Sequence, residues 1–331
     1  SDLLKQVNGI GRIDLTDILR PAPIQFVAPS LQGNISTSDI VALAAGAEGQ
    51  QYFPDAVAYD MPVQHRWSNI TAESRILGTR YSSHRVRDRF DGSYKKLPEA
   101  RLTLTDGSVP GNGLAAFNAE GVNITVHGGA EDGVGKMAFG GKVAILKSPG
   151  KRGEYINGSV GKSFCYGAQK GLFIVQGNAD SRACIRLSGA DVIFGGEVTS
   201  PLRDDLGSIA ARANLKGFAF EYMTNGRAVV MGDPGPWICA GMTGGIIYQR
   251  LVPEMGLDQA AIARRIAKGA KVEIKPLSEK GVNDLQELLG KYHEELLSNG
   301  QTEAAEKVAR LLADLPAHFV SIVPVNMQAD Q

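Results

Sequence analysis

Residues 113–145 read GLAAFNAEGVNITVHGGAEDGVGKMAFGGKVAI, so that short apolar runs alternate with glycine-rich turns. The same arrangement recurs along the chain, where a glycine precedes each of six strand-like runs: Gly121, Gly141, Gly171, Gly189, Gly226 and Gly245. Successive members of this set are separated by 20, 30, 18, 37 and 19 residues, and three of these intervals fit a single period. A recurring unit of this size predicts a repeat architecture.

The length of the repeating unit narrows the choice of fold. About 19 residues are too few for a helix pair or a four-stranded propeller blade, but they suffice for three short strands joined by corners. We therefore expect an all-β solenoid, a right-handed parallel β-helix, with its handedness taken from the general preference of parallel connections. The six glycines are predicted to be structural turn residues, because a corner needs positive φ or close approach of the next unit.

Composition divides the chain into three predicted parts. Residues 1–72 form an irregular N-terminal arm without a repeat, residues 73–250 the β-helix, and residues 251–331 an α-helical C-terminal cap. Apolar residues at helical spacing predict one helix over 282–297 and a second that begins near residue 302, and we expect both to cover the last repeat unit. The longest interval, of 37 residues, holds either a degenerate extra repeat or an insertion, residues 197–216, which the repeat does not explain.

Charge and cysteine content restrict the partners and the compartment. The chain has 331 residues, with 35 Lys and Arg balanced by 35 Asp and Glu, which argues against nucleic acid as the main partner. Its apolar runs are far shorter than the roughly 20 residues that cross a bilayer, so no membrane association is expected. Cys165, Cys184 and Cys239 stand far apart, which is typical of buried thiols in a reducing compartment. We expect a cytoplasmic protein.

No motif in the sequence makes a convincing active site. The segment 133–138 has the G-x-G-x-x-A outline of a dinucleotide loop, but no βαβ unit surrounds it. The segment 161–163 resembles the end of a phosphate-binding loop whose first glycine is missing. The five histidines are dispersed without ligand spacing, and no nucleophile motif is present. We therefore predict no catalytic, cofactor-binding or metal-binding residue in this chain.

Several strings, taken in order, resemble the C-terminal domain of the glutamate synthase large subunit, a domain known from its GXGXG repeats. Residues 74–90 are similar to the entry segment of that domain, and the opening stretch to its first units. The middle and last units correspond to residues 167–196, 221–232 and 240–248, and the closing helix and strand to residues 292–324. The resemblance covers roughly residues 73–325.

The resemblance implies a supporting role. In glutamate synthase, an amidotransferase domain releases ammonia from glutamine, and a flavin-containing barrel uses that ammonia for the reductive amination of 2-oxoglutarate. This chain would be a non-catalytic scaffold subunit of such an oxidoreductase complex, without a cofactor of its own. Its expected partners are amidotransferase-like and FMN-barrel subunits, which would carry the FMN and an iron–sulfur cluster. The insertion and the arm depart from the family pattern, so the product of the complex stays open.

Two other functions remain. The chain could be a stand-alone β-solenoid binding module that uses the insertion or the arm as its recognition surface. It could also be the C-type subunit of a formylmethanofuran dehydrogenase or formyltransferase–hydrolase complex, which shares the solenoid. The entry segment and the tail favour the glutamate synthase branch, and neighbouring genes would separate the three.

Overall fold

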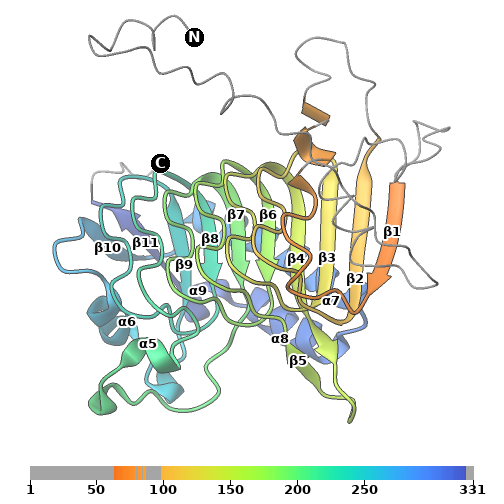
Figure 1. Cartoon of the computed structure of the whole chain (residues 1–331). Helices are drawn as coiled ribbons and strands as arrows, with labels where there is room; N and C mark the ends of the chain where they lie inside the picture. The colour runs from red at the N-terminus through yellow and green to blue at the C-terminus, as the bar shows by residue number, and fades with distance from the viewer. Residues whose placement is uncertain (1–62, 80, 84, 87–97, 326–331) are drawn as a thin grey trace, which may run out of the picture.

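The computed structural model describes residues 63–79, 81–83, 85–86 and 98–325, so most of the predicted N-terminal arm lies outside the described residues. Within these residues the strands form a single sheet (Figure 1). Its order is β1 (Val63–Ser68), β2 (Ala100–Ser108), β3 (Val122–Gly128), β4 (Phe139–Pro149), β6 (Lys170–Val175), β7 (Ser188–Phe194), β8 (Asn225–Val230), β9 (Ile246–Arg250), β11 (Phe319–Pro324) and β10 (Val272–Pro276), with β5 (Tyr155–Asn157) paired to β4.

Parallel pairing runs from β1 to β9, and each parallel strand comes from one sequence unit. The six apolar runs after the turn glycines become β3, β4, β6, β7, β8 and β9, which confirms them as strands. At the far end the sheet becomes mixed, because β11 pairs antiparallel with both β9 and β10. The described part of the chain contains no helix long and apolar enough to cross a membrane.

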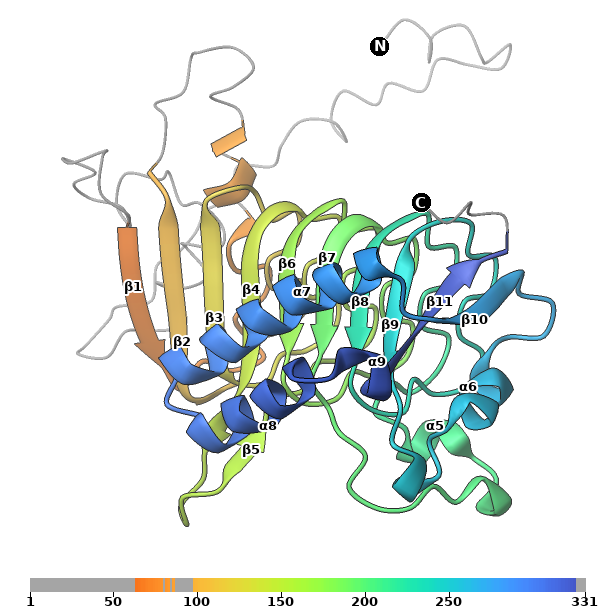
Figure 2. The same ribbon diagram turned by 180° about the vertical axis from the view of Figure 1, so that it is seen from behind.

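The predicted fold class is wrong. Each unit contributes one strand rather than three, and the residues between strands are turns that meet their neighbours through isolated bridges, such as Ala130 with Val160 and Val160 with Ala179. Helices cover one face of the sheet, and the region expected to be an α-helical cap adds two strands to it (Figure 2). The protein is therefore a mixed α/β structure built on an 11-stranded, mostly parallel sheet, not an all-β parallel β-helix.

The two predicted helices are confirmed, but they lie elsewhere than expected. Helices α7 (Glu279–Ser298) and α8 (Thr302–Leu312) run across the sheet instead of closing its last unit (Figure 2). Shorter elements of the described residues include η1 (Asp204–Leu206), α5 (Ile209–Arg212), η2 (Pro253–Met255), α6 (Gln259–Arg265) and α9 (Leu315–His318).

The position of the helices follows from the strands themselves. In β4, Val143 and Ile145 point into a core formed with the turns, whereas Ala144 and Leu146 point into a second core formed with the helices. Both faces of the sheet are thus apolar and both must be covered. The helices supply Leu285, Leu288 and Leu289 to the second core, and all three are fully buried.

An ion-pair network joins α7 to the sheet. Arg227 of β8 donates to Asp191 of β7 at 2.7 Å, and to Asp284 and Glu287 of α7 at 2.8 Å each. Tyr248 of β9 donates its hydroxyl to Asp284 at 2.6 Å. The hydrogen bond from Arg227 is the largest cause that lowers the pKa of Glu287 from 4.5 to about 2.

This network makes part of the stability depend on pH. A carboxyl group whose pKa is lower in the folded state stabilises the fold fully above its unfolded pKa, and loses that contribution as the pH falls through its folded pKa. We expect the Glu287→Gln variant to have a lower melting temperature than the wild type at neutral pH. The difference should shrink as the pH falls from 4.5 towards about 2.

The control is Glu306→Gln, which changes an exposed glutamate of α8 for which the described residues provide no ion pair. Its difference from the wild type should stay nearly constant over the same range. Because Glu287 is partly exposed, the effect should not exceed about 1 kcal/mol. If the difference in melting temperature between Glu287→Gln and the wild type does not change with pH, the ion pair of Glu287 does not contribute to the pH dependence of stability.

Candidate functional site

The six turn glycines of the sequence lie at the starts of the parallel strands. Each has positive φ: Gly121 80°, Gly141 73°, Gly171 108°, Gly189 152°, Gly226 99° and Gly245 81°. At Gly141 the requirement is double, because a Cβ atom would also overlap the carbonyl oxygen of Val122 on the preceding strand. An alanine there would meet both backbone strain and a steric clash.

A second set of positive-φ residues lies in the turns and follows a fixed pattern. In six successive turns, three alternate residues adopt this conformation, at the spacing of a G-x-G-x-G motif. The sets are Gly113, Ala115, Phe117; Gly133, Gly135, Met137; Ser163, Cys165, Gly167; Arg182, Cys184, Arg186; Phe218, Phe220, Tyr222; and Trp237, Cys239, Gly241. Most of these residues are not glycine, although each sits where glycine is the least strained choice.

The middle position of each set points into the core. All three cysteines, Cys165, Cys184 and Cys239, occupy this position and are fully buried. Burial raises the pKa of each thiol far above its usual range. The thiols are therefore protonated at neutral pH, which makes them poor nucleophiles and poor metal ligands.

The motifs that resemble cofactor loops have structural roles in this fold. The glycines at 133 and 135 belong to a turn that leads into β4, not into the helix that a dinucleotide loop requires. The segment 161–163 lies in the next turn, between β5 and β6. Within the described residues, no group of three His, Cys, Asp or Glu side chains is placed to hold a metal ion.

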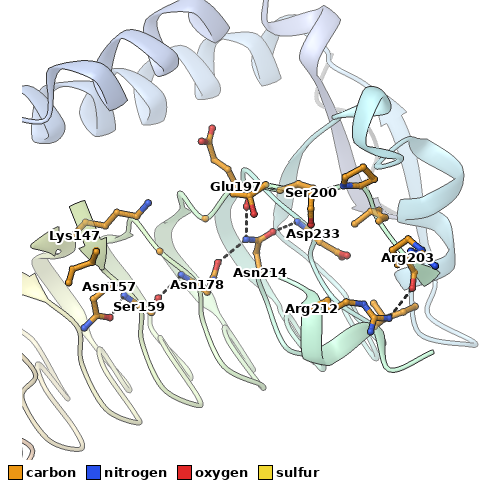
Figure 3. A pocket seen from close by; sticks show the side chains of 18 of the residues that line it. Lys147, Asn157, Ser159, Asn178, Glu197, Ser200, Arg203, Arg212, Asn214 and Asp233 are labelled. Carbon is orange, nitrogen blue, oxygen red and sulfur yellow. Dashed lines mark hydrogen bonds between the residues drawn. The ribbon is translucent and has the colours of Figure 1, made fainter. Parts of the chain in front are cut away.

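A cleft of about 520 Å³ lies beside the insertion (Figure 3). Its walls come from the β4–β5 hairpin, from the start of the insertion with η1 and α5, and from the turns of neighbouring units. The lining is mostly polar and carries both signs of charge, including Lys147, Glu197, Arg212 and Asp233. Such a surface suits a polar, hydrogen-bonding partner better than an apolar ligand.

A ladder of amide and hydroxyl groups forms the floor of the cleft (Figure 3). The Asn178 backbone N–H donates to the Ser159 hydroxyl at 3.0 Å, and the Asn214 amide donates to Asn178 Oδ1 at 2.8 Å. Asn214 also donates to the carbonyl of Glu197 at 3.0 Å and accepts from the Asp233 backbone N–H at 2.8 Å. Because Asn214 uses its amide in both directions, the ladder fixes one turn to the next rather than presenting free groups.

A buried ion-pair triad holds the insertion against the rest of the fold. Arg265 of α6 is fully buried and donates to Asp233 at 2.8 and 2.9 Å and to Asp204 of η1 at the same distances. The hydrogen bond from Arg265 is the main cause that lowers the pKa of Asp204. At the start of the insertion, Glu197 pairs with Arg250 at 2.9 Å. The insertion is thus an ordered, anchored part of the structure.

The sequence did not reveal the residues of this site. Asp204 and Asp205 are adjacent, yet Asp205 is exposed beside Arg203 whereas Asp204 pairs with the buried Arg265, and nothing in the sequence separates the two. Asp233 and Arg265 carried no local signal, because they lie 32 residues apart and join only in the folded chain. A sequence clue did exist for the cleft, since the insertion interrupts the repeat at this point.

Comparisons with known proteins agree with the pattern in the turns. The family model described as "GXGXG motif" matches residues 51–201 and 206–325, and the match is interrupted only inside the insertion. The chain is 27% identical to the ferredoxin-dependent glutamate synthase of Pyropia yezoensis, an alignment of 83% of this chain with 16% of that protein. It is 30% identical to the glutamate synthase [NADPH] large chain of Azospirillum brasilense, over 96% of this chain and 20% of that protein.

A third relative is the glutamate synthase [NADH] of Schizosaccharomyces pombe, 30% identical over 78% of this chain and 11% of that protein. The chain therefore spans a fifth or less of the length of these curated relatives. The relation supports a role connected with glutamate synthase. Because the family model covers most of the chain, the chain belongs to the GXGXG motif family.

Proposed function

We propose that this chain is the non-catalytic scaffold subunit of a cytoplasmic, multi-subunit glutamate-synthase-type enzyme. In that enzyme, ammonia taken from glutamine serves the reductive amination of a 2-oxo acid. The observation that carries the proposal is the alignment: most of this chain corresponds to a small part of much longer glutamate synthases. The remaining chemistry would then belong to amidotransferase-like and FMN-barrel subunits.

The construction of the sheet suits a supporting role. Both of its faces are covered by apolar cores, and ion pairs connect α7 and the insertion to it. Rigidity matters in a multi-site enzyme, because a misplacement of about 1 Å between reacting groups can lower the rate by roughly 100-fold. A sheet fixed on both faces can hold two partner subunits at a constant separation.

We assign the FMN and the iron–sulfur cluster to the partner subunits. The protonated, buried thiols of this chain do not fit a cluster, which requires thiolate ligands that converge on one point. The turn that has the outline of a dinucleotide loop leads into a strand. The chain's own contribution is to bind and position the subunits that hold these groups.

The insertion, residues 197–216, is proposed as one contact surface for a partner subunit. It interrupts the family match, it lines the polar cleft, and it presents Leu206 as an exposed apolar side chain. The Leu206→Asp variant should keep the fold, since the neighbouring Asp204 and Arg265 are unchanged. It should weaken co-purification with the amidotransferase-like or FMN-barrel subunit by at least roughly tenfold.

The matched control is Leu297→Asp, which places the same charge at an exposed leucine of α7. The measurement is co-expression with the proposed partner subunits, followed by affinity purification and an absorption spectrum of the purified complex. Flavin absorption should appear in the complex and not in the isolated chain. If the wild-type chain is purified without these subunits under native conditions, the scaffold function is wrong, and ligand binding in the cleft becomes the function to test.

A further inference from the structure

Three aromatic side chains stand exposed on two neighbouring turns. The middle residues of these turns, Phe220 and Cys239, belong to the core that does not include α7 and α8. Phe218, Tyr222 and Trp237 are 42%, 54% and 51% exposed. Arg182 and Arg186 project from the turn that precedes them. We refer to these five residues as the aromatic patch. Large apolar side chains gathered on a surface mark interaction sites more often than chance.

The patch is held in one arrangement by contacts between turns. The rings of Phe218 and Trp237 stack with centroids 4.9 Å apart and an angle of 25° between planes. The guanidinium of Arg186 lies 5.8 Å from the centroid of the Tyr222 ring. Backbone hydrogen bonds fix the turns themselves, since the Phe218 N–H donates to Pro236 at 3.0 Å and the Tyr222 N–H to Ala240 at 2.8 Å. The side chains are therefore preorganised.

The fold does not require these side chains. All five patch residues have positive φ, a conformation that costs a non-glycine residue roughly 1 kcal/mol or more. The equivalent outer positions of earlier turns carry the small residues Gly113, Gly133, Ser163 and Gly167, although Phe117 and Met137 also occupy such positions. Small residues therefore serve at most of these positions, whereas the patch gathers five large ones on three adjacent turns. Glycine would relieve the backbone strain at each of these positions, so large side chains there are not explained by backbone stability. They are explained by a role in binding.

The chemistry of the patch indicates its partner. Trp, Tyr and Arg are enriched among the residues that dominate binding energy in protein interfaces. Trp and Tyr bring a large contact area at little cost in conformational freedom, and Arg brings a charge that pairs with carboxylates. Within the described residues neither Arg182 nor Arg186 forms an ion pair, so both remain available to carboxylates. A second copy of this chain would bring arginines towards arginines. The complement is a different surface, with acidic side chains around an apolar pocket.

We propose that the aromatic patch is the docking surface for a partner subunit of the enzyme, one whose contact face is acidic at the rim and apolar at the centre. The inference rests on the proposed function, because that function supplies the partner. It differs from the insertion contact in position and chemistry: the cleft is polar, whereas the patch is aromatic and basic. A scaffold that holds two subunits needs two such surfaces.

The test uses the full chain with the double substitution Phe218→Gly and Trp237→Gly. Because glycine prefers the backbone conformation of both positions, the variant should fold and melt no lower than the wild type, which separates binding from stability. Its affinity for the co-expressed amidotransferase-like or FMN-barrel subunit should fall at least roughly tenfold. The control is Phe117→Gly, which removes a similarly exposed ring from an outer, positive-φ turn position outside the patch and should leave the affinity unchanged.

Tryptophan fluorescence gives a second measurement. The chain has two tryptophans, and Trp67 is buried, so acrylamide should quench mainly Trp237 in the isolated chain and much less in the complex. If the wild type binds a subunit and the double variant binds it equally well, the patch is not the docking surface, while the scaffold function stands. If the wild type binds neither subunit, both proposals fail. Self-association that the double variant abolishes would replace the partner subunit with a second copy.

Discussion

Replacing Arg265 by alanine should lower the free energy of unfolding by about 3–5 kcal/mol. The side chain is fully buried, and four hydrogen bonds connect it to Asp233 and Asp204. Without it the buried carboxylate of Asp233 has lost its counter-charge, and a cavity is left beside α6. Urea unfolding followed by circular dichroism measures the loss.

Arg264 offers a matched control for this experiment. It is the neighbouring residue of α6 and pairs with the same Asp204, but at 3.3 Å and from an exposed position. The Arg264→Ala variant should change stability by no more than about 0.5–1 kcal/mol. Similar losses in the two variants would show that the triad adds no more than a surface ion pair, and that the insertion is anchored by other contacts.

The Gly141→Ala variant should lose about 3–5 kcal/mol of stability. Positive φ accounts for roughly 1 kcal/mol or more of this, and the clash of the new methyl group with the Val122 carbonyl accounts for the rest. The clash cannot be relieved by a side-chain rotation, because its partner is backbone in the adjacent strand β3. Thermal unfolding of the purified variant is the measurement.

A substitution at Gly107 separates the cost of positive φ from the cost of the steric clash. Its φ is 74°, almost the same as the 73° of Gly141, yet an added Cβ would have no atom within 4 Å. The Gly107→Ala variant should therefore show the conformational cost alone, about 1 kcal/mol. If Gly141→Ala is no more harmful than Gly107→Ala, close approach between units does not limit the residue at 141. By sequence, Gly92 would be a further comparison, because it lies outside the repeat and a substitution there should be milder. It falls outside the described residues.

Local patterns predicted the elements correctly. A glycine followed by an apolar run, as in residues 121–128, became a strand, and the helical spacing of residues 282–297 became α7. These signals are short-range: positive φ favours glycine, and amphipathic periodicity follows the geometry of the helix. The interval between repeats also predicted correctly that successive strands pair in parallel.

The predicted fold class was wrong because it rested on the length of the repeat, and the repeat length does not show that both faces of the strands are buried. Residues 143–146 read VAIL and residues 228–231 read AVVM, without the alternation of a strand that faces water. Continuous runs of this kind are typical of parallel strands covered on both sides. They indicated that the helices would lie on the sheet, where Leu285 and Leu288 now pack.

The candidate sites depend on contacts that no local pattern records. Asp233 and Arg265 meet across 32 residues, and Asp204 and Arg265 across 61. Phe218 and Trp237 become neighbours because two turns are adjacent. Both have positive φ, a backbone conformation in which glycine is the usual residue. An aromatic residue in a G-x-G-x-G position hides the motif, which is why the repeat was visible at its strands and not at its turns.

The principal contacts of each parallel strand are with its immediate neighbours along the sheet. At about 4.8 Å per strand, the nine steps from β1 to β10 span roughly 43 Å. In evolutionary terms, gain or loss of one strand-and-turn unit would alter this length by a single step and leave the remaining pairings intact. The length of the sheet could thus change in discrete increments, while the insertion and the aromatic patch keep their own structure.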